Sequence, residues 1–289
     1  MTTQGENRQN PQGAPRRRPR RWHWGAGAIL GVILLVTVIP LYWMIASALK
    51  TSPELAKIPP TLWPHKFSLQ QFDKIFTQTH IASATVYSLI VAASTTLLVV
   101  VLGSLAAYAV TVLRFQARRQ LLSMSLVTQF LPQAATLVPI FLLWMRLGLI
   151  NKLPGVTLVY VAFQLPVGVW LLTGYFTSVP EEIVDAAAVD GCGRFQTLLR
   201  VVAPVAAPGL AAVAIWCAIG SWSELLFAMI FLNTAKQTIP VAVASLVGEH
   251  TTDTGMMLAA ATVAALPPLI LFFFLQKYFT DGLTGAVKG

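Results

Sequence analysis

The stretch Ser178–Pro208, SVPEEIVDAAAVDGCGRFQTLLRVVAPVAAP, places charged residues and glycines in an otherwise apolar chain. It carries four of the eleven acidic residues of the protein and two arginines. The apolar runs that lead into it and out of it contain no charged residue for more than twenty positions. A polar segment between two such runs is typical of a loop that connects two membrane-spanning helices.

The composition points to a bilayer as the surrounding solvent. Only 11% of the 289 residues are charged and 56% are hydrophobic, whereas an ordinary soluble domain has roughly 25% charged residues. A spanning helix needs about 20 mostly apolar residues. We therefore expect an all-α integral membrane protein with six transmembrane helices. The six runs without Asp, Glu, Lys or Arg are Gly25–Leu49, Gln78–Leu113, Gln120–Met145, Leu153–Pro180, Val201–Ser223 and Thr254–Gln276.

The distribution of basic residues predicts the orientation. If the N-terminus is cytoplasmic, six spans return the C-terminus to the same side, and 13 of the 20 Lys and Arg residues fall there. Cytoplasmic loops carry such an excess in multi-pass proteins of the cytoplasmic membrane. The RRRPRR run at 16–21 lies beside the first span, so we interpret it as a contact with anionic membrane lipid and not with nucleic acid.

The chain divides into a short tail and one membrane domain. Residues 1–24 are rich in Gln, Pro, Asn and Arg and are predicted to be a disordered basic cytoplasmic tail. Residues 25–289 form the six-helix domain, with a core at about 81–289 and the cytoplasmic loop at 178–208. Internal prolines predict bent helices; they are Pro132, Pro139, Pro166, Pro267 and Pro268.

The predicted outer loop, Thr51–His80, contains one short amphipathic helix. Leu69, Phe72, Ile75 and Phe76 recur there at helical spacing. This helix could lie on the membrane surface or pack against the ends of the spans, and we favour packing.

The opening stretch itself predicts two short helices joined by an elbow. Ser178 and Glu181 have the spacing of a capping box, with Pro180 in the first turn. Asp190-Gly191 should end the first helix, because glycine accepts a positive φ. A second helix, about Arg194–Val202, then runs into Pro204. The physical pattern alone fits two roles equally well: a docking surface for a partner, or a hairpin resting on lipid headgroups.

Motifs for bond-making chemistry are missing. The sequence contains no G-x-x-x-x-G-K-[ST] nucleotide loop, no H-E-x-x-H zinc motif and no intramembrane aspartate pair. Its two cysteines have no metal-like spacing, three of its four histidines fall outside the six runs, and the fourth, His80, lies at the start of one of them. We therefore expect a translocation or structural role with no catalytic residue, no metal and no cofactor in this chain.

One carboxylate, Glu224, falls beside a span. A charged side chain at the centre of a spanning helix costs about 2.5–3.5 kcal/mol, and such residues usually face a bundle interior or water. Glu224 could line a translocation pathway with Ser223, pair with another subunit, or be solvated near the outer interface. Gln129, Gln133 and Gln164 are weaker pathway candidates, since amides also hold helices together.

The stretch resembles the EAA loop of binding-protein-dependent ABC importer permeases, whose pattern is E-A-A-x3-G-x9-I-x-L-P. Here it reads Asp185-Ala186-Ala187, three residues, Gly191, nine residues, Val201, Val202 and Ala203-Pro204. The spacing agrees throughout, with Asp for Glu at 185, Val for Ile at 201 and Ala for Leu at 203. Flanking segments, among them LPQAATLVPIFLLWMRLGLINKLPGVTLVY and SWSELLFAMIFL, resemble the MalG-like, maltose-type carbohydrate permeases over about residues 25–289.

This resemblance implies a type I ABC importer transmembrane fold and a transport function. The chain would be one half of a channel whose other half is a sister MalF-like permease. A separate ABC ATPase dimer would bind ATP and Mg and hold the EAA loop, and an extracytoplasmic solute-binding protein would deliver a sugar. The residues that the resemblance assigns to the ATPase contact are Glu181, Asp185, Ala186, Ala187, Gly191, Arg194 and Pro204.

Two other function classes compete with a carbohydrate permease. The first is an ABC importer permease for another solute, such as glycerol phosphate or a polyamine. The second is a secondary transporter or a membrane enzyme, either of which would work without an ATPase. Dependence of uptake on a separate ATPase distinguishes the ABC importers from the secondary transporter.

Overall fold

The computed structural model describes residues 21–112, 117–247 and 253–286, and every regular element in this part of the chain is helical. α1 (Arg21–Ala48) forms, up to Trp43, a unit of its own, and the residues from Met44 onward form a second unit. Helix α1 begins four residues before the predicted boundary of the tail at 24/25.

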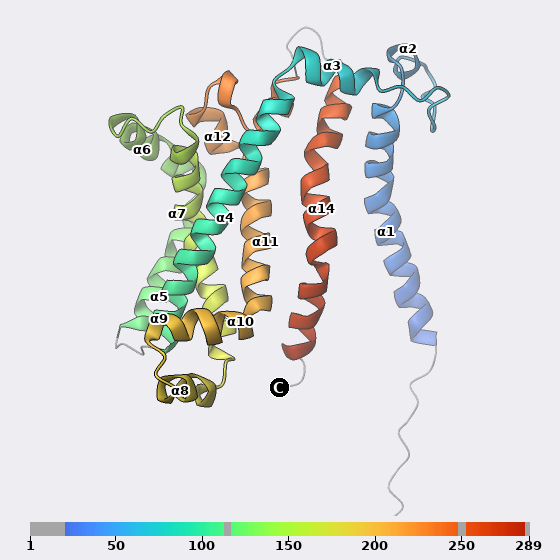
Figure 1. Ribbon diagram of the computed structural model, residues 1–289. Coiled ribbons are helices and arrows are strands. Elements are labelled where there is room, and N and C mark those ends of the chain that lie inside the picture. Colours follow the sequence, from blue (N-terminus) through green and yellow to red (C-terminus); the bar gives the residue numbers. More distant parts are fainter. Residues whose placement is uncertain (1–20, 113–116, 248–252, 287–289) are drawn as a thin grey trace, which may run out of the picture. The chain divides into compact units, whose positions relative to one another are not determined.

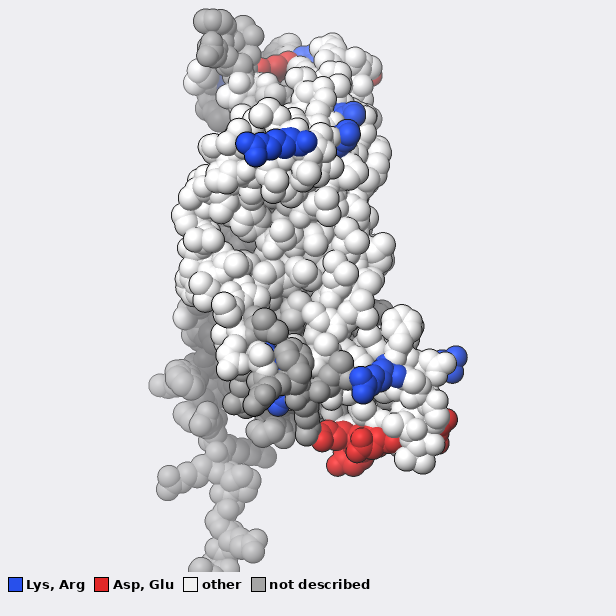
Figure 2. Space-filling view, turned by 90° about the vertical axis from the view of Figure 1, so that its left-hand side faces the viewer, with Lys and Arg blue, Asp and Glu red and all other residues white. Residues whose placement is uncertain are grey.

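Four long helices make the centre of the second unit. α4 (Ile81–Val112) packs along α7 (Leu153–Thr177) and against α11 (Ala207–Ser223), which also packs against α14 (Thr254–Ala286) (Figure 1). Figure 2 shows that the middle of one face carries no charged side chain, while charged residues gather toward its two ends. This distribution fits helices that cross a hydrocarbon layer.

The six predicted spans are present in a modified form. Among the described residues, four helices are long and apolar enough to cross a membrane unbroken, and two bent pairs could supply the other two spans. The unbroken helices are Gly27–Ala48, Ile81–Val112, Leu153–Thr177 and Thr254–Phe273.

The predicted span at Gln120–Met145 is broken into two helical segments, and the break lies at Pro132, one of the prolines expected to bend a helix. The chain there forms Leu122–Phe130, the end of α5 (Arg118–Val127) with a 3-10 turn, and α6 (Gln133–Arg146), at an angle of 101°. The break lies at Leu131-Pro132, where both residues are extended with ψ of 125°. A residue before proline is sterically disfavoured in the helical region, and proline has no N–H to continue the helix.

The predicted span Val201–Ser223 also breaks, at Ala206. The helical segments Arg194–Val205 and Ala207–Ser223 meet there at 83°. Ala206 is buried and has φ −88° and ψ 16°, and Pro208 stands in the first turn of α11. Other internal prolines leave their helices unbroken, since α7 continues through Pro166 and α14 through Pro267 and Pro268.

Short helices cover the two ends of the bundle. At one end, which we call the α3 end, lie α2 (Ser52–Leu55), α3 (Gln70–Gln78), α12 (Leu226–Phe231) and α13 (Ile239–Ala244) (Figure 1). The opposite end, the α8 end, carries α8 (Glu181–Val189), α9 (Arg194–Thr197) and α10 (Ala203–Val205). The favoured interpretation of α3 is confirmed: Ile75 is fully buried and Phe72 packs against the cluster formed with α13 and α14.

One close contact between α7 and α11 depends on a glycine. A Cβ atom on Gly209 would lie 2.2 Å from Cγ of Tyr175, well inside van der Waals contact. No side chain larger than hydrogen fits there unless the two helices move apart. Gly174, one residue before Tyr175, has open space around its Cβ position.

We predict that Gly209→Ala destabilises the protein, whereas Gly174→Ala is neutral or slightly stabilising. Overpacking of this kind costs about 1–3 kcal/mol, while alanine in an open helical position gains up to about 1 kcal/mol over glycine. The measurement is the thermal midpoint of unfolding of the detergent-solubilised protein. Unfolding is detected by the reaction of the Cys217 thiol with a thiol-specific dye, because this thiol is buried in the folded protein. Equal midpoints for the two variants would contradict the close α7–α11 contact.

Candidate functional site

The first helix of the candidate site, α8, starts differently from the prediction. Ser178 is the C-cap of α7, with φ −79° and ψ −7°, and its Oγ donates to the carbonyl oxygen of Tyr175 at 2.7 Å. The predicted capping box is therefore wrong, because an N-cap residue needs an extended backbone. Pro180 occupies the N-cap, and Glu181 and Glu182 follow in the first turn, where carboxylates oppose the helix dipole.

A three-residue link, Ser178 to Pro180, connects α7 to α8. Its middle residue, Val179, is buried in the apolar cluster at the α8 end, together with Phe176 and Leu198. Its last residue is Pro180, whose ring fixes φ. The direction of α8 is thus tied closely to the end of α7.

The end of α8 is confirmed as predicted. Gly191 has φ +81°, and its N–H donates to the carbonyl oxygen of Ala188 at 3.1 Å. The N–H of Cys192 donates to the carbonyl oxygen of Ala187 at 2.9 Å. This pair of hydrogen bonds is a Schellman motif, which requires a left-handed residue at the position that Gly191 occupies.

The second helix is longer than predicted and contains a widened turn. α9 is followed by a π-helical stretch, Leu198–Val202, and then by α10, so the helical segment ends at Val205 and not at Val202. Pro204 lies inside this segment and offers no N–H, which fits the altered hydrogen-bond pattern just before it. Buried Leu198 and Val202 hold the segment against the bundle.

The two helices form a hairpin, which we call the α8–α9 hairpin (residues 181–197). Most of the predicted contact residues lie on its exposed surface; they are Glu181, Asp185, Ala186, Gly191, Arg194 and, just beyond the hairpin, Pro204. Ala187 is buried instead, on the inner face of α8. Two large apolar side chains on either side of Gly191, those of Val189 and Phe195, are also exposed. We did not single these out from the sequence, although apolar residues beside a charged turn are the signal.

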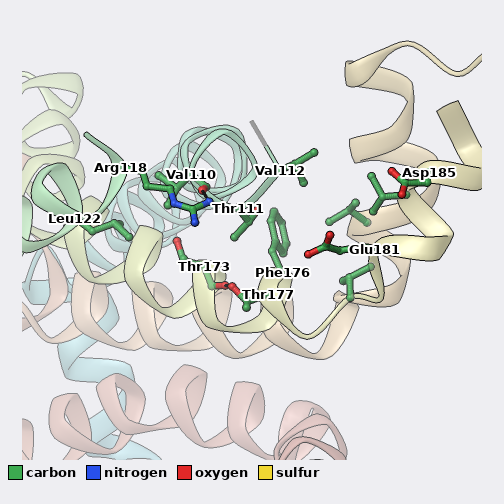
Figure 3. Close-up of a pocket in the computed structure, with 13 residues that line it drawn as sticks. Val110, Thr111, Val112, Arg118, Leu122, Thr173, Phe176, Thr177, Glu181 and Asp185 are labelled. Carbon is green, nitrogen blue, oxygen red and sulfur yellow. Dashed lines mark hydrogen bonds between the residues drawn. The ribbon is translucent and has the colours of Figure 1, made fainter. Parts of the chain in front are cut away.

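A cavity of about 530 Å³ lies behind α8, between the ends of α4, α5 and α7. Figure 3 shows the Arg118 guanidinium on one side and the carboxylates of Glu181 and Asp185 on the other. Arg118 Nη1 donates to the carbonyl oxygen of Val110 at 3.4 Å. No group of three or more His, Cys, Asp or Glu is placed to hold a metal ion in the part of the chain that the structure describes.

The second candidate site is the carboxylate of Glu224, which lies in a helix break at the α3 end. Its Oε1 accepts from the N–H of Phe227 at 3.0 Å, and its Oε2 accepts from the N–H of Ala228 at 3.3 Å and from the Tyr160 hydroxyl. The carboxylate therefore caps α12 and ties it to α7. The alternative of a merely solvated side chain is wrong, since these three donors come from the protein itself.

Gln164 and Ser221 form a further polar contact between α7 and α11. Gln164 Nε2 donates to Ser221 Oγ at 2.9 Å, while Gln164 Oε1 is enclosed and has no hydrogen-bond partner. Gly220 leaves space beside this amide, because a Cβ there would be 3.5 Å from Gln164 Oε1. Ser221 and Tyr160 were not predicted as site residues, because only the fold brings them to Gln164 and Glu224.

The remaining pathway candidates occupy different positions. Gln129 Nε2 donates to the carbonyl oxygen of Phe163 at 2.8 Å, so this side chain joins the 3-10 turn after α5 to α7. Ser223 is exposed at the end of α11. Gln133 is exposed at the start of α6. The side chains of Glu224 and Gln129 thus bond to α7, and Gln164 lies on α7. The structure places Gln133 and Ser223 at exposed positions on other helices.

Comparison with known proteins identifies the family. The profile of the binding-protein-dependent transport system inner membrane component family matches residues 99–285. A putative ABC transporter permease protein, ORF1, of Streptomyces antibioticus is 38% identical over 227 residues, covering 78% of this chain and 99% of the relative. The chain belongs to this family. It is therefore a multi-pass protein of the inner membrane.

Two further comparisons cover more of the chain than the family profile does. The trehalose/maltose transport system permease protein MalG of Thermococcus litoralis is 31% identical over 268 residues, covering 90% of this chain and 96% of that protein. A chain in the crystal structure of a bacterial ABC transporter for import of the acidic polysaccharide alginate superposes with a TM-score of 0.78, covering 93% of this chain and all of that one at 20% identity. The expected importer permease fold is confirmed.

We predict that Glu224→Ala destabilises the protein more than Glu224→Gln. Alanine leaves the N–H groups of Phe227 and Ala228 without an acceptor, at a cost of about 0.5–2 kcal/mol for a lost helix cap. Glutamine keeps one oxygen that can accept from the start of α12. The measurement is again the thermal midpoint in detergent. If the two variants were equally unstable, the negative charge and not the capping geometry would account for the role of Glu224.

Proposed function

We propose that this permease is one subunit of an ATP-driven importer that moves a carbohydrate across the cytoplasmic membrane. The observation that carries this proposal is the α8–α9 hairpin. It has the EAA spacing, it is closed by a Schellman turn at Gly191, and it exposes most of the residues of that pattern at one end of the bundle. A separate ABC ATPase would dock on this hairpin.

The surface of the hairpin suits a docking contact. Ala186 and Gly191 add little side-chain bulk, so another surface can approach the backbone closely. Exposed Val189 and Phe195 offer apolar contacts to a partner pocket. Asp185 and Arg194 are exposed as well and can set the register by charge complementarity.

The hairpin is also built to transmit movement. Val179 and Pro180 tie α8 to α7, and the buried elbow at Ala206 ties the second helix to α11. In the proposed cycle the ATPase subunits bind ATP and Mg and close, and the hairpin moves with them. The channel then shifts between inward-facing and outward-facing states, because the ligands of the transporter bind one of these states more tightly than the other.

The proposed assembly has further partners. A sister MalF-like permease forms the other half of the channel, and an extracytoplasmic binding protein delivers the solute. Sugar uptake is named for several relatives, including the trehalose/maltose and alginate systems described above. Their likeness favours a carbohydrate as cargo. The distribution of Lys and Arg in the sequence favours an orientation with the α8 end in the cytosol and both termini cytoplasmic.

The pathway residues would be those with polar groups near α7 and α11. Gln164 Oε1 has an unused acceptor site that could receive a hydrogen bond from a sugar hydroxyl. Glu224, Ser223, Gln129 and Gln133 remain the other candidates. Glu224 would act mainly through the position it gives to α12 and Tyr160.

We predict that Gly191→Val abolishes ATPase binding and transport but leaves membrane insertion intact. A left-handed backbone costs an L-residue roughly 1–2 kcal/mol, and a β-branched side chain is a further disadvantage there. The measurement is co-purification of the ATPase with the permease, followed by uptake in the same cells.

The matched control for this variant is Gly193→Val. Gly193 has an extended backbone, φ −68° and ψ 160°, and open space around its Cβ position. Valine is therefore compatible with Gly193, and that variant should bind the ATPase normally. Normal uptake by Gly191→Val would count against the docking role of the hairpin.

We predict that purified transporter hydrolyses ATP rapidly only when the binding protein is present with its sugar. The test reconstitutes this permease, its sister subunit and the ATPase in liposomes and screens a panel of maltose-type and chitobiose-type sugars. Stimulation by one class of sugar would support the proposal. Full solute uptake by this chain alone would refute it and indicate a secondary transporter.

A further inference from the structure

The segment that joins α2 to α3 exposes a series of large apolar side chains. Ile58 is 96% exposed and Trp63 is 58% exposed. The others are Leu62, Phe67 and Leu69. Scattered apolar residues are common on protein surfaces, but a contiguous set of this kind marks an interaction site.

The segment has a fixed shape, so the exposure does not come from loose chain. The carboxylate of Glu54 is buried, and its Oε1 accepts from Thr61 Oγ1 at 3.0 Å, from the His65 N–H at 2.9 Å and from His65 Nδ1 at 2.9 Å. Lys50 Nζ, also buried, donates to the carbonyl oxygen of Thr61. These bonds hold the middle of the segment while the apolar side chains point outward.

This arrangement persists over the pH range in which a membrane transporter works. The hydrogen bonds from the His65 backbone and ring lower the pKa of Glu54 from 4.5 to about 2. A lowered carboxyl pKa contributes stability that is present above pH 4.5 and is lost only as the pH falls toward 2. The carboxylate therefore remains ionised and bonded at any pH near neutrality.

The charges of the segment are all of one sign. Lys57 and Lys66 are exposed among the apolar side chains, and residues 55–69 contain no Asp or Glu. Aromatic side chains with lysines beside them are typical of segments at a membrane–water interface, where anionic headgroups attract the basic groups. Trp63 and Phe67 also stack edge to face, with ring centroids 5.7 Å apart.

The position of the segment agrees with its composition. It follows α2, which begins four residues after the end of the candidate span Gly27–Ala48. In Figure 1 it projects sideways beyond α2 and does not fold over the end of the bundle. Two of the apolar residues of α3, Ile75 and Phe72, instead pack inward, while Phe76 is half exposed.

We propose that residues 57–69 are an interfacial anchor that inserts Ile58, Leu62, Trp63 and Phe67 into the phospholipid headgroup region at the α3 end, with Lys57 and Lys66 on anionic lipid phosphates. The anchor would fix the depth of the bundle end in the bilayer. It does not depend on the ATPase or on the identity of the solute, so its test is separate from that of the proposed function.

The experiment labels a single cysteine with an environment-sensitive fluorophore in the assembled transporter. Ile58→Cys is introduced together with Cys192→Ser, and Cys217 is buried and stays unlabelled. Nanodiscs of phosphatidylcholine and phosphatidylglycerol carry a nitroxide either just below the headgroup or deep in the acyl chain. We expect the label at 58 to lose most of its emission with the shallow nitroxide and little with the deep one.

The control is Ala235→Cys, exposed in the turn Thr234–Lys236 at the same end of the bundle. Equal quenching at both positions would overturn the proposal. It would also be overturned if the label at 58 were unaffected by nitroxide lipid but changed its emission when the binding protein was added, which would indicate a protein-binding surface. In Lys57→Glu, Lys66→Glu double variants, quenching should weaken when the nitroxide is on phosphatidylglycerol; unchanged quenching would contradict the headgroup contact.

Discussion

The structure depends on one constraint: inside a bilayer no water is available for backbone N–H and C=O groups. The long helices α4, α7, α11 and α14 satisfy these groups internally. Irregular backbone is concentrated where the chain turns between helical segments, at Leu131-Pro132, at Ala206 and at Glu224. At Glu224 a side chain supplies the missing acceptor, since its carboxylate receives the N–H groups at the start of α12. The break at Glu224 thus has its own means of satisfying the backbone.

The same constraint explains why the candidate contact surface is a hairpin at one end of the bundle. A partner protein in water can reach only what projects from the bilayer, and α8 with α9 projects there (Figure 1). The hairpin satisfies its own backbone through the Schellman turn at Gly191 and buries Ala187, Leu198 and Val202 inward. Its exposed charges and apolar side chains therefore remain available for another molecule, and its shape does not depend on that molecule.

Features set by neighbouring residues were predictable from the sequence, and features set by distant residues were not. The apolar runs predicted the long helices, and Asp190-Gly191 predicted the end of α8, because helix length and a left-handed turn are local properties. The capping box at Ser178 failed because α7 already uses that residue as its own C-cap. The partner of Glu224 is Tyr160, which lies 64 positions away, so no local pattern could identify the pair.

Connectivity links the hairpin to the polar contacts far from it. α7 leads into α8 through three residues, and the second helix of the hairpin leads into α11 through the buried elbow at Ala206. The bonds Gln164–Ser221 and Tyr160–Glu224 join α7 to α11 and to the α12 segment that follows it. A rigid displacement of the hairpin would act on both α7 and α11 at the α8 end. The Gln164–Ser221 contact lies between these two helices, so a change in the angle between them would act on this contact.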